Sequence, residues 1–178
     1  MIADQTATLI AVVNCPFPKR ITNEVIADRL RCFARLLAIR SEDFYRINAY
    51  DDAASIIAAW SEPISEIAKR EGGKGLRVIP GVGRSISEKI VELVNSGTFE
   101  AWEKLTIETP ASVLDLLDVP GIGIKTAGLL HQKFKISTIC DLRKFVEGGG
   151  LELVDGLDEK RASEIRHFVA QLSAQCDE

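Results

Sequence analysis

The 178-residue sequence has few aromatic residues, few histidines and cysteines, and no long hydrophobic run. Aromatic residues make up 6% of the chain, and its two histidines and four cysteines form no metal-binding pattern. The cysteines show no close pairing, so we expect a reducing, cytoplasmic setting. No apolar run approaches the length that crosses a bilayer, and we therefore expect no membrane partner.

The composition is otherwise that of a globular protein, with 46% hydrophobic and 27% charged residues. The length allows one domain or two small ones. The net charge of −4 is unusual for a nucleic-acid-binding protein. Basic residues nevertheless gather around two glycine-rich segments: Lys74, Arg77, Arg84 and Lys89, then Lys125, Lys133 and Lys135. This distribution is compatible with weak, salt-sensitive DNA binding.

The most informative feature is a pattern that occurs twice, as IPGVG at residues 79–83 and as VPGIG at residues 119–123. Each copy lies between segments of helical periodicity, so each is expected to form a tight hairpin. Glycine permits positive φ and the close approach of another backbone. The unpaired amides that open the next helix, with the helix dipole, form an anion site, and phosphate is the usual anion. Two such sites predict two contacts with one polyanion.

A third, degenerate copy reads VDGLD at residues 154–158. Asp155 replaces the proline of the pattern, and Asp158 replaces its second glycine. A carboxylate at the start of a helix repels phosphate. We therefore interpret this copy as a structural helix cap and not as a DNA contact.

The hydrophobic periodicity predicts an all-α protein of two small helical units, each carrying one helix-hairpin-helix motif. The apolar residues of the first helix recur at the spacing of one buried face: Ile26, Leu30, Phe33 and Leu37. The four residues 72–75 (GGKG) are expected to form a sharply bent loop. The expected parts are an N-terminal appendage at residues 1–20, a first unit at 21–106 and a second at 107–178.

The region around the first hairpin resembles the N-terminal lyase domain of the family X DNA polymerases. The resemblance is carried by four segments in order: NAY at 48–50, AASII at 53–57, IPGVG at 79–83 and SISEKI at 85–90. The second hairpin lies where the next subdomain of that family carries its own. The resemblance runs from about residue 21 to the C-terminus and implies a DNA repair module.

The resemblance also implies a catalytic residue, Lys89. In the related domain, the lysine at this place attacks C1′ of an abasic sugar, forms a Schiff base and releases 5′-deoxyribose phosphate by β-elimination. The attack requires a neutral amine, which the positive charge of Arg77 or Arg84 would favour. The alternative is an ordinary solvated lysine that faces Glu92 three residues further along the helix.

Three further residues complete the implied pocket. Arg46 lies at the family's 5′-phosphate position, Tyr50 lines the same pocket, and Glu88 is a candidate acceptor of the tyrosine hydroxyl proton. A buried core aromatic is the alternative interpretation of Tyr50. Asp51 and Asp52 follow where the family tends to be basic, and they oppose an anion at this place.

The DNA contacts are expected at the two hairpins. The amides and side chains concerned are Gly81, Gly83, Arg84 and Ser85 in the first hairpin, and Gly121, Gly123, Lys125 and Thr126 in the second. The resemblance implies a monovalent cation, Na⁺ or K⁺, held by the backbone carbonyls of Ile79 and Val82 and of Val119 and Ile122. No cofactor is expected to be required.

The favoured interpretation is a catalytically silent module that grips the backbone of gapped, nicked or single-strand-containing DNA without sequence preference. An active 5′-deoxyribose phosphate lyase and a protein-interaction domain that has lost DNA binding are the alternatives. A repair protein is a further candidate partner. No pair of metal-binding aspartates follows the second hairpin, so we expect no polymerase activity from this chain alone.

Overall fold

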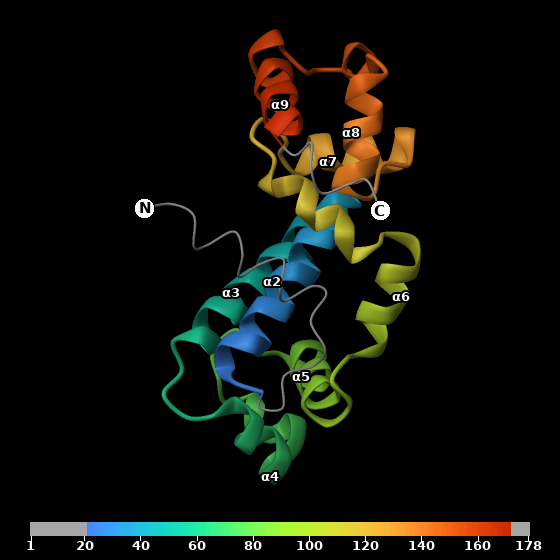
Figure 1. Ribbon diagram of the computed structural model, residues 1–178. Helices are drawn as coiled ribbons and strands as arrows, with labels where there is room; N and C mark the ends of the chain where they lie inside the picture. The colour runs from blue at the N-terminus through green and yellow to red at the C-terminus, as the bar shows by residue number, and fades with distance from the viewer. Residues whose placement is uncertain (1–20, 172–178) are drawn as a thin grey trace. The chain divides into compact units, whose positions relative to one another are not determined.

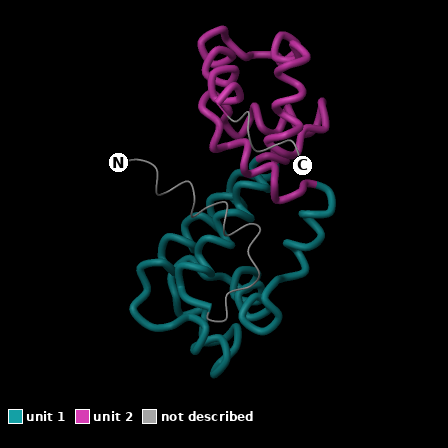
Figure 2. Tube along the Cα trace, in the orientation of Figure 1, with its two compact units in different colours: residues 1–38, 42–108 teal, residues 39–41, 109–178 magenta. Residues whose placement is uncertain are grey.

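The computed structural model describes residues 21–171, so the expected appendage at residues 1–20 lies outside the described residues (Figure 1). The described chain contains helices and no strand, which confirms the predicted all-α fold. It divides into two compact units, residues 21–38 with 42–108 and residues 39–41 with 109–171 (Figure 2). Within residues 21–171, no helix is both long and apolar enough to cross a membrane.

The first unit, which we call unit 1, is built on five helices among its described residues. They are α2 (Asn23–Ile39), α3 (Phe44–Ala58), α4 (Ile64–Leu76), α5 (Arg84–Ser96) and α6 (Glu100–Glu108). The Thr22 hydroxyl accepts a hydrogen bond from the Val25 amide at the start of α2. The Asp43 carboxylate accepts one from the Arg46 amide at the start of α3, a typical N-cap.

The core of unit 1 forms around the predicted apolar face of α2. Its four residues, Ile26, Leu30, Phe33 and Leu37, are each at most 2% exposed, which confirms the predicted face. The Phe33 ring packs edge-on against the rings of Tyr50 and Phe99, with centroid distances of 4.9 and 5.2 Å. Because burial of each large apolar side chain contributes about 1.5–3 kcal/mol, this cluster fixes α3 against α2.

The prediction of a loop at residues 72–75 is wrong, because α4 continues to Leu76 after the single non-helical residue Gly72. Gly72, with φ 62° and ψ −154°, redirects the chain, and a further helical turn follows. Gly75 and Leu76 in that turn are buried, and Leu76 belongs to the core. Burial of Leu76 explains why the segment is helical despite three glycines, which lower helix propensity.

The second unit, which we call unit 2, contains two 3₁₀-helices and three α-helices among its described residues. They are η1 (Ala111–Asp118), α7 (Ile124–Phe134), α8 (Ile139–Glu147), η2 (Gly150–Leu153) and α9 (Glu159–Gln171). Thr138 and Asp141 form a capping box at the start of α8. The Thr138 hydroxyl accepts a hydrogen bond from the Asp141 amide, and the Asp141 carboxylate accepts one from the Thr138 amide.

Candidate functional site

All three hairpins adopt the same turn. In each, the amide of the fourth residue donates to the carbonyl of the first, at 3.0 Å in residues 79–83, 3.0 Å in 119–123 and 3.3 Å in 154–158. The third residue is always a glycine with positive φ: +78° at Gly81, +89° at Gly121 and +75° at Gly156. The degenerate copy is therefore a hairpin of the same backbone form.

The second glycine of the pattern behaves differently from the first. Gly83 (φ −76°, ψ −178°) and Gly123 (φ −103°, ψ 179°) have extended backbone that any residue adopts. A Cβ atom added at either position would meet nothing within 4 Å. Neither backbone conformation nor packing among the described residues therefore requires glycine here. The open space leaves room for another molecule to approach the backbone closely.

Free backbone amides lie directly beyond these glycines. The first helical hydrogen bonds are Ser87 N to Gly83 O at 2.9 Å and Ala127 N to Gly123 O at 2.8 Å. Within residues 21–171, no acceptor binds the amides of Arg84 and Ser85, or those of Ile124 and Lys125. Unpaired amides at the positive end of a helix dipole are suited to bind an anion.

In the third hairpin a side chain of the protein itself caps the start of the following helix. The Asp158 carboxylate accepts a hydrogen bond of 2.9 Å from the amide of Arg161 at the start of α9. This contact confirms that Asp158 caps the helix. Since the pattern places glycine there in the other hairpins, the first two hairpins keep their helix starts open and the third does not.

Lys89 lies beside the first hairpin and is half-buried. Its Nζ donates to Ser85 Oγ at 2.9 Å and to the Ser85 carbonyl at 3.3 Å. The Nζ also lies 5.8 Å from the centroid of the Tyr50 ring. The alternative pairing with Glu92 is not formed, because Glu92 accepts from the Glu100 amide at 2.9 Å and caps α6.

Tyr50 packs in the core of unit 1 and also lies near Lys89. It is a core residue, 3% exposed and packed against Phe33, and the remaining face of its ring adjoins the Lys89 amine. No hydrogen bond joins Tyr50 to Glu88 in the part of the chain that the structure describes. The carboxylate of Glu88 instead pairs with Arg84 at 2.9 Å.

The charged residues around the first hairpin form a compact group on the surface. The hydrogen bond from Arg84 lowers the pKa of Glu88. Desolvation opposes this effect, and the charges of Arg84, Lys89 and Arg77 add to it. Arg77 also donates from Nε to the Gly73 carbonyl at 3.2 Å. The two arginines expected to act on Lys89 thus both act on its neighbour Glu88, and Glu88 partly neutralises Arg84.

Arg46 is exposed at the first turn of α3, where its Nη1 lies 3.4 Å from a carboxylate oxygen of Glu42.

Asp51, which follows Tyr50 in α3, has cationic neighbours on α2. Burial raises the pKa of Asp51, while Arg35 and Arg31 of α2 oppose that rise and Asp52 adds to it. The acidic residues after Tyr50 are therefore partly balanced from α2, a relationship that the local sequence does not reveal.

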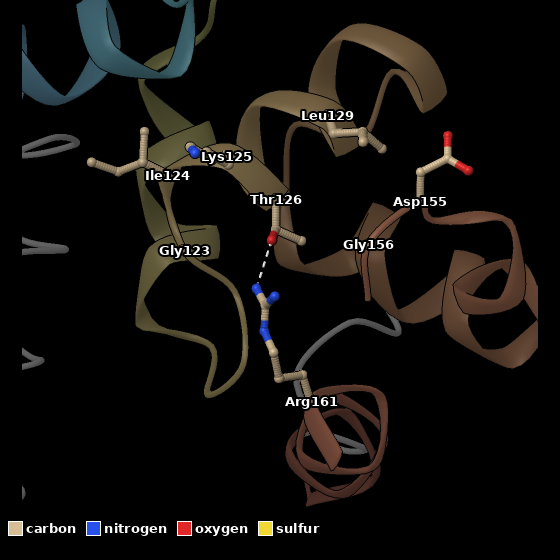
Figure 3. Close-up of a pocket in the computed structure, with 8 residues that line it drawn as sticks. All are labelled: Gly123, Ile124, Lys125, Thr126, Leu129, Asp155, Gly156 and Arg161. Atoms are coloured by element: carbon tan, nitrogen blue, oxygen red, sulfur yellow. Dashed lines mark hydrogen bonds between the residues drawn. The ribbon is translucent and has the colours of Figure 1, made fainter. Parts of the chain in front are cut away.

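Around the second hairpin, the sequence analysis missed Arg161. This residue belongs to α9, but its Nη2 donates to Thr126 Oγ1 at 2.8 Å (Figure 3). Its Nε donates to the Gly121 carbonyl at 3.0 Å. The side chain borders a cavity of about 540 Å³. Other residues around this cavity are Gly123, Lys125, Thr126, Asp155 and Gly156. The forty-residue separation explains why no local pattern indicated the contact.

The monovalent cation expected at the hairpin carbonyls stays a prediction. Among residues 21–171, no cluster of three or more histidine, cysteine or carboxylate side chains is placed to hold a metal ion. A monovalent cation would instead use hairpin carbonyls. Those of Ile79 and Val119 already accept the turn hydrogen bonds from Val82 and Ile122.

Comparison with known proteins agrees with this geometry. Residues 21–99 match the helix-hairpin-helix domain family. The chain is 27% identical over 161 residues to DNA polymerase lambda of Rattus norvegicus, a match that covers 84% of this chain and 26% of that protein. It is 20% identical over 146 residues to the DNA polymerase/3′-5′ exonuclease PolX of Bacillus subtilis (strain 168), covering 82% and 25%.

These matches confirm the predicted resemblance to family X DNA polymerases over most of the chain. The chain spans about a quarter of the length of these two relatives.

Proposed function

We propose that this chain is a DNA-binding module of DNA repair that grips the phosphate backbone of gapped or nicked DNA through its first two hairpins. Phosphates are contacted by the amides beyond Gly83 and Gly123, with Arg84 and Lys125 beside them. Contacts of this kind position a protein on DNA but carry no sequence information. Binding is therefore independent of base sequence.

The open space over Gly83 and Gly123 carries this proposal. Glycine is not required there by the backbone or by packing, yet both hairpins place it over unpaired amides. An approaching phosphate explains both features, because its oxygens come within hydrogen-bond distance only where no side chain intervenes. The basic side chains beside the hairpins and the similarity to two DNA polymerases support the same proposal.

The direct test is a binding titration with fluorescent duplexes of one base composition that are gapped, nicked or intact. The proposal predicts tighter binding to the gapped and nicked forms, and equal affinity for gapped duplexes whose sequences are permuted. A folded protein that binds none of these duplexes would overturn the proposal and favour the protein-interaction alternative. Strong preference for one sequence at equal DNA shape would contradict backbone recognition.

A second function, 5′-deoxyribose phosphate lyase activity, is favoured by the position of Lys89. Its amine lies between Ser85 and the Tyr50 ring, outside ion-pair distance of every described carboxylate. In this proposal the amine attacks C1′ of the abasic sugar, and water leaves as the Schiff base forms. β-Elimination then breaks the C3′–O3′ bond and frees the 5′-phosphate of the DNA, and water hydrolyses the Schiff base to release the sugar phosphate and the amine. Covalent trapping with borohydride on a 5′-incised abasic duplex tests this activity separately from binding.

A further inference from the structure

Arg161 belongs to the helix that follows the third hairpin, but its side chain binds the second hairpin. The guanidinium donates to Thr126 Oγ1 at 2.8 Å (Figure 3) and to the Gly121 carbonyl at 3.0 Å. Gly121 is the positive-φ residue of the turn, and Thr126 lies in the first turn of α7. One planar guanidinium therefore fixes both ends of the segment whose amides are open to an anion.

The main chain of Arg161 makes a second contact with the same turn. Its carbonyl oxygen lies 2.9 Å from the place that a Cβ atom of Gly121 would occupy. Its amide, in turn, is held by the Asp158 carboxylate at 2.9 Å. Asp158 thus fixes the backbone of Arg161, and Arg161 fixes the second hairpin.

We propose that Arg161 is a positioning residue, which holds the second hairpin in the shape that presents its amides to phosphate. This inference rests on the proposed function. It also gives the degenerate hairpin a role. Asp158 prevents this hairpin from binding phosphate, and through Arg161 the hairpin supports the second hairpin instead. Among residues 21–171, no guanidinium donates to the first hairpin in this way. There the residue equivalent to Thr126 is the buried Ile86, and Gly81 adjoins Ile56.

The test compares Arg161→Gln and Arg161→Lys with Arg166→Gln in the full chain. Arg166 lies on the same helix and pairs with Glu159, so its replacement removes an equal charge without touching the hairpin. We expect Arg161→Gln to weaken binding to a gapped duplex about tenfold, the effect of losing a charge-assisted hydrogen bond. Arg161→Lys, whose single ammonium must serve two acceptors, should bind more tightly than Arg161→Gln but more weakly than the wild type. Arg166→Gln should keep the affinity of the wild type.

Salt dependence and double variants separate positioning from a direct phosphate contact. A positioning residue leaves the slope of log K against log salt unchanged, whereas loss of a phosphate contact reduces it by about 0.9. Arg161→Gln should add no further loss to Gly123→Val but its full loss to Gly83→Val. A reduced slope, or full additivity with Gly123→Val, would overturn the proposal.

The backbone amide resonances of the free protein give a readout that requires no DNA. In Arg161→Gln, the resonances of Gly121 and Gly123 should shift while those of Gly81 and Gly83 stay in place. Unchanged Gly121 and Gly123 resonances would overturn the positioning role. If the wild-type protein does not bind DNA, the proposed function fails, and this spectrum still decides whether Arg161 shapes the hairpin.

Discussion

The Nζ of Lys89 lies 5.8 Å from the centroid of the Tyr50 ring, although the two residues come from different helices, α5 and α3. The ring is immobilised by burial and by its edge-on contact with Phe33. A cation over an aromatic face is attracted to it, so the amine is held beside the first hairpin. The Tyr50 ring thus holds the Lys89 amine in one place beside the first hairpin. The lyase proposal requires in addition that this amine lose its proton before it attacks the sugar.

Lys89→Ala should abolish the borohydride-trapped adduct on a 5′-incised abasic duplex if Lys89 is the nucleophile. Lys89→Arg should abolish it too, because a guanidinium stays protonated and cannot attack the sugar. Both variants should bind gapped DNA within about threefold of the wild type, since one lysine is a small part of the phosphate contact. Gel analysis of trapped complexes, with anisotropy on the same samples, makes the measurement.

Two results would count against this account of Lys89. A wild-type protein that binds the incised duplex without forming an adduct is a silent module. An adduct that persists in Lys89→Ala would assign the chemistry to another amine, such as Lys74.

Affinity for gapped DNA should fall steeply with salt. Each phosphate neutralised contributes about −0.9 to the slope of log K against log salt, so a few phosphates at two hairpins give a slope of a few units. The slope should be the same for gapped duplexes of different sequence, because phosphate contacts do not distinguish bases. A binding constant insensitive to salt, measured between low and physiological ionic strength, would exclude backbone recognition.

Gly121→Ala should destabilise the fold, and Gly123→Ala should not. Gly121 has φ +89°, and its added Cβ would lie 2.9 Å from the carbonyl oxygen of Arg161. Forcing a side chain into such a backbone region costs about 1–3 kcal/mol of unfolding free energy. Gly123 has extended backbone and open space, so its alanine variant serves as the matched control. Chemical denaturation of both variants that gave equal losses would contradict the distinction between the two glycines.

Asp141 should stabilise the protein only above the acidic range. Burial opposes ionisation of its carboxyl, but hydrogen bonds from the Thr138 side chain and from the Ser137 and Thr138 amides prevail and lower its pKa below 3.8. A carboxyl with a depressed pKa contributes stability at higher pH and loses it as the pH falls through the folded-state pKa. The stability difference between wild type and Asp141→Asn, measured by denaturation, should therefore shrink from pH 6 to pH 3. A difference that grew on acidification would be inconsistent with this cap.

Local periodicity was sufficient to predict the helices that bury one regular face. The face of α2 that contains Leu30 and Phe33 follows directly from their spacing, because an apolar stripe at that period must be covered. The helical turn after Gly72 was missed because glycine content suggests a loop, whereas burial of Leu76 depends on tertiary packing. Propensity is a weak guide where packing decides.

The candidate site shows the same limit. The glycine pattern alone located the hairpins, since the positive φ of Gly81 and Gly121 depends on residues close in sequence. The pattern did not show that the two glycines of each hairpin have different roles, because that difference is visible only in their backbone angles and neighbouring atoms. Nor did it reveal Arg161, whose contact with Gly121 joins distant parts of the chain.

The central claim is that both main hairpins hold DNA through amides kept accessible by glycine. The most direct measurement is the affinity of Gly83→Val, Gly123→Val and the double variant for a gapped duplex, with circular dichroism to verify folding. A Cβ atom added at either glycine meets nothing within 4 Å among the described residues, and it stands next to the open amides in sequence. We expect each single variant to fold normally and bind about tenfold more weakly, by loss of charge-assisted hydrogen bonds, and the double variant to bind weakest. Wild-type affinity in both folded single variants would contradict the claim.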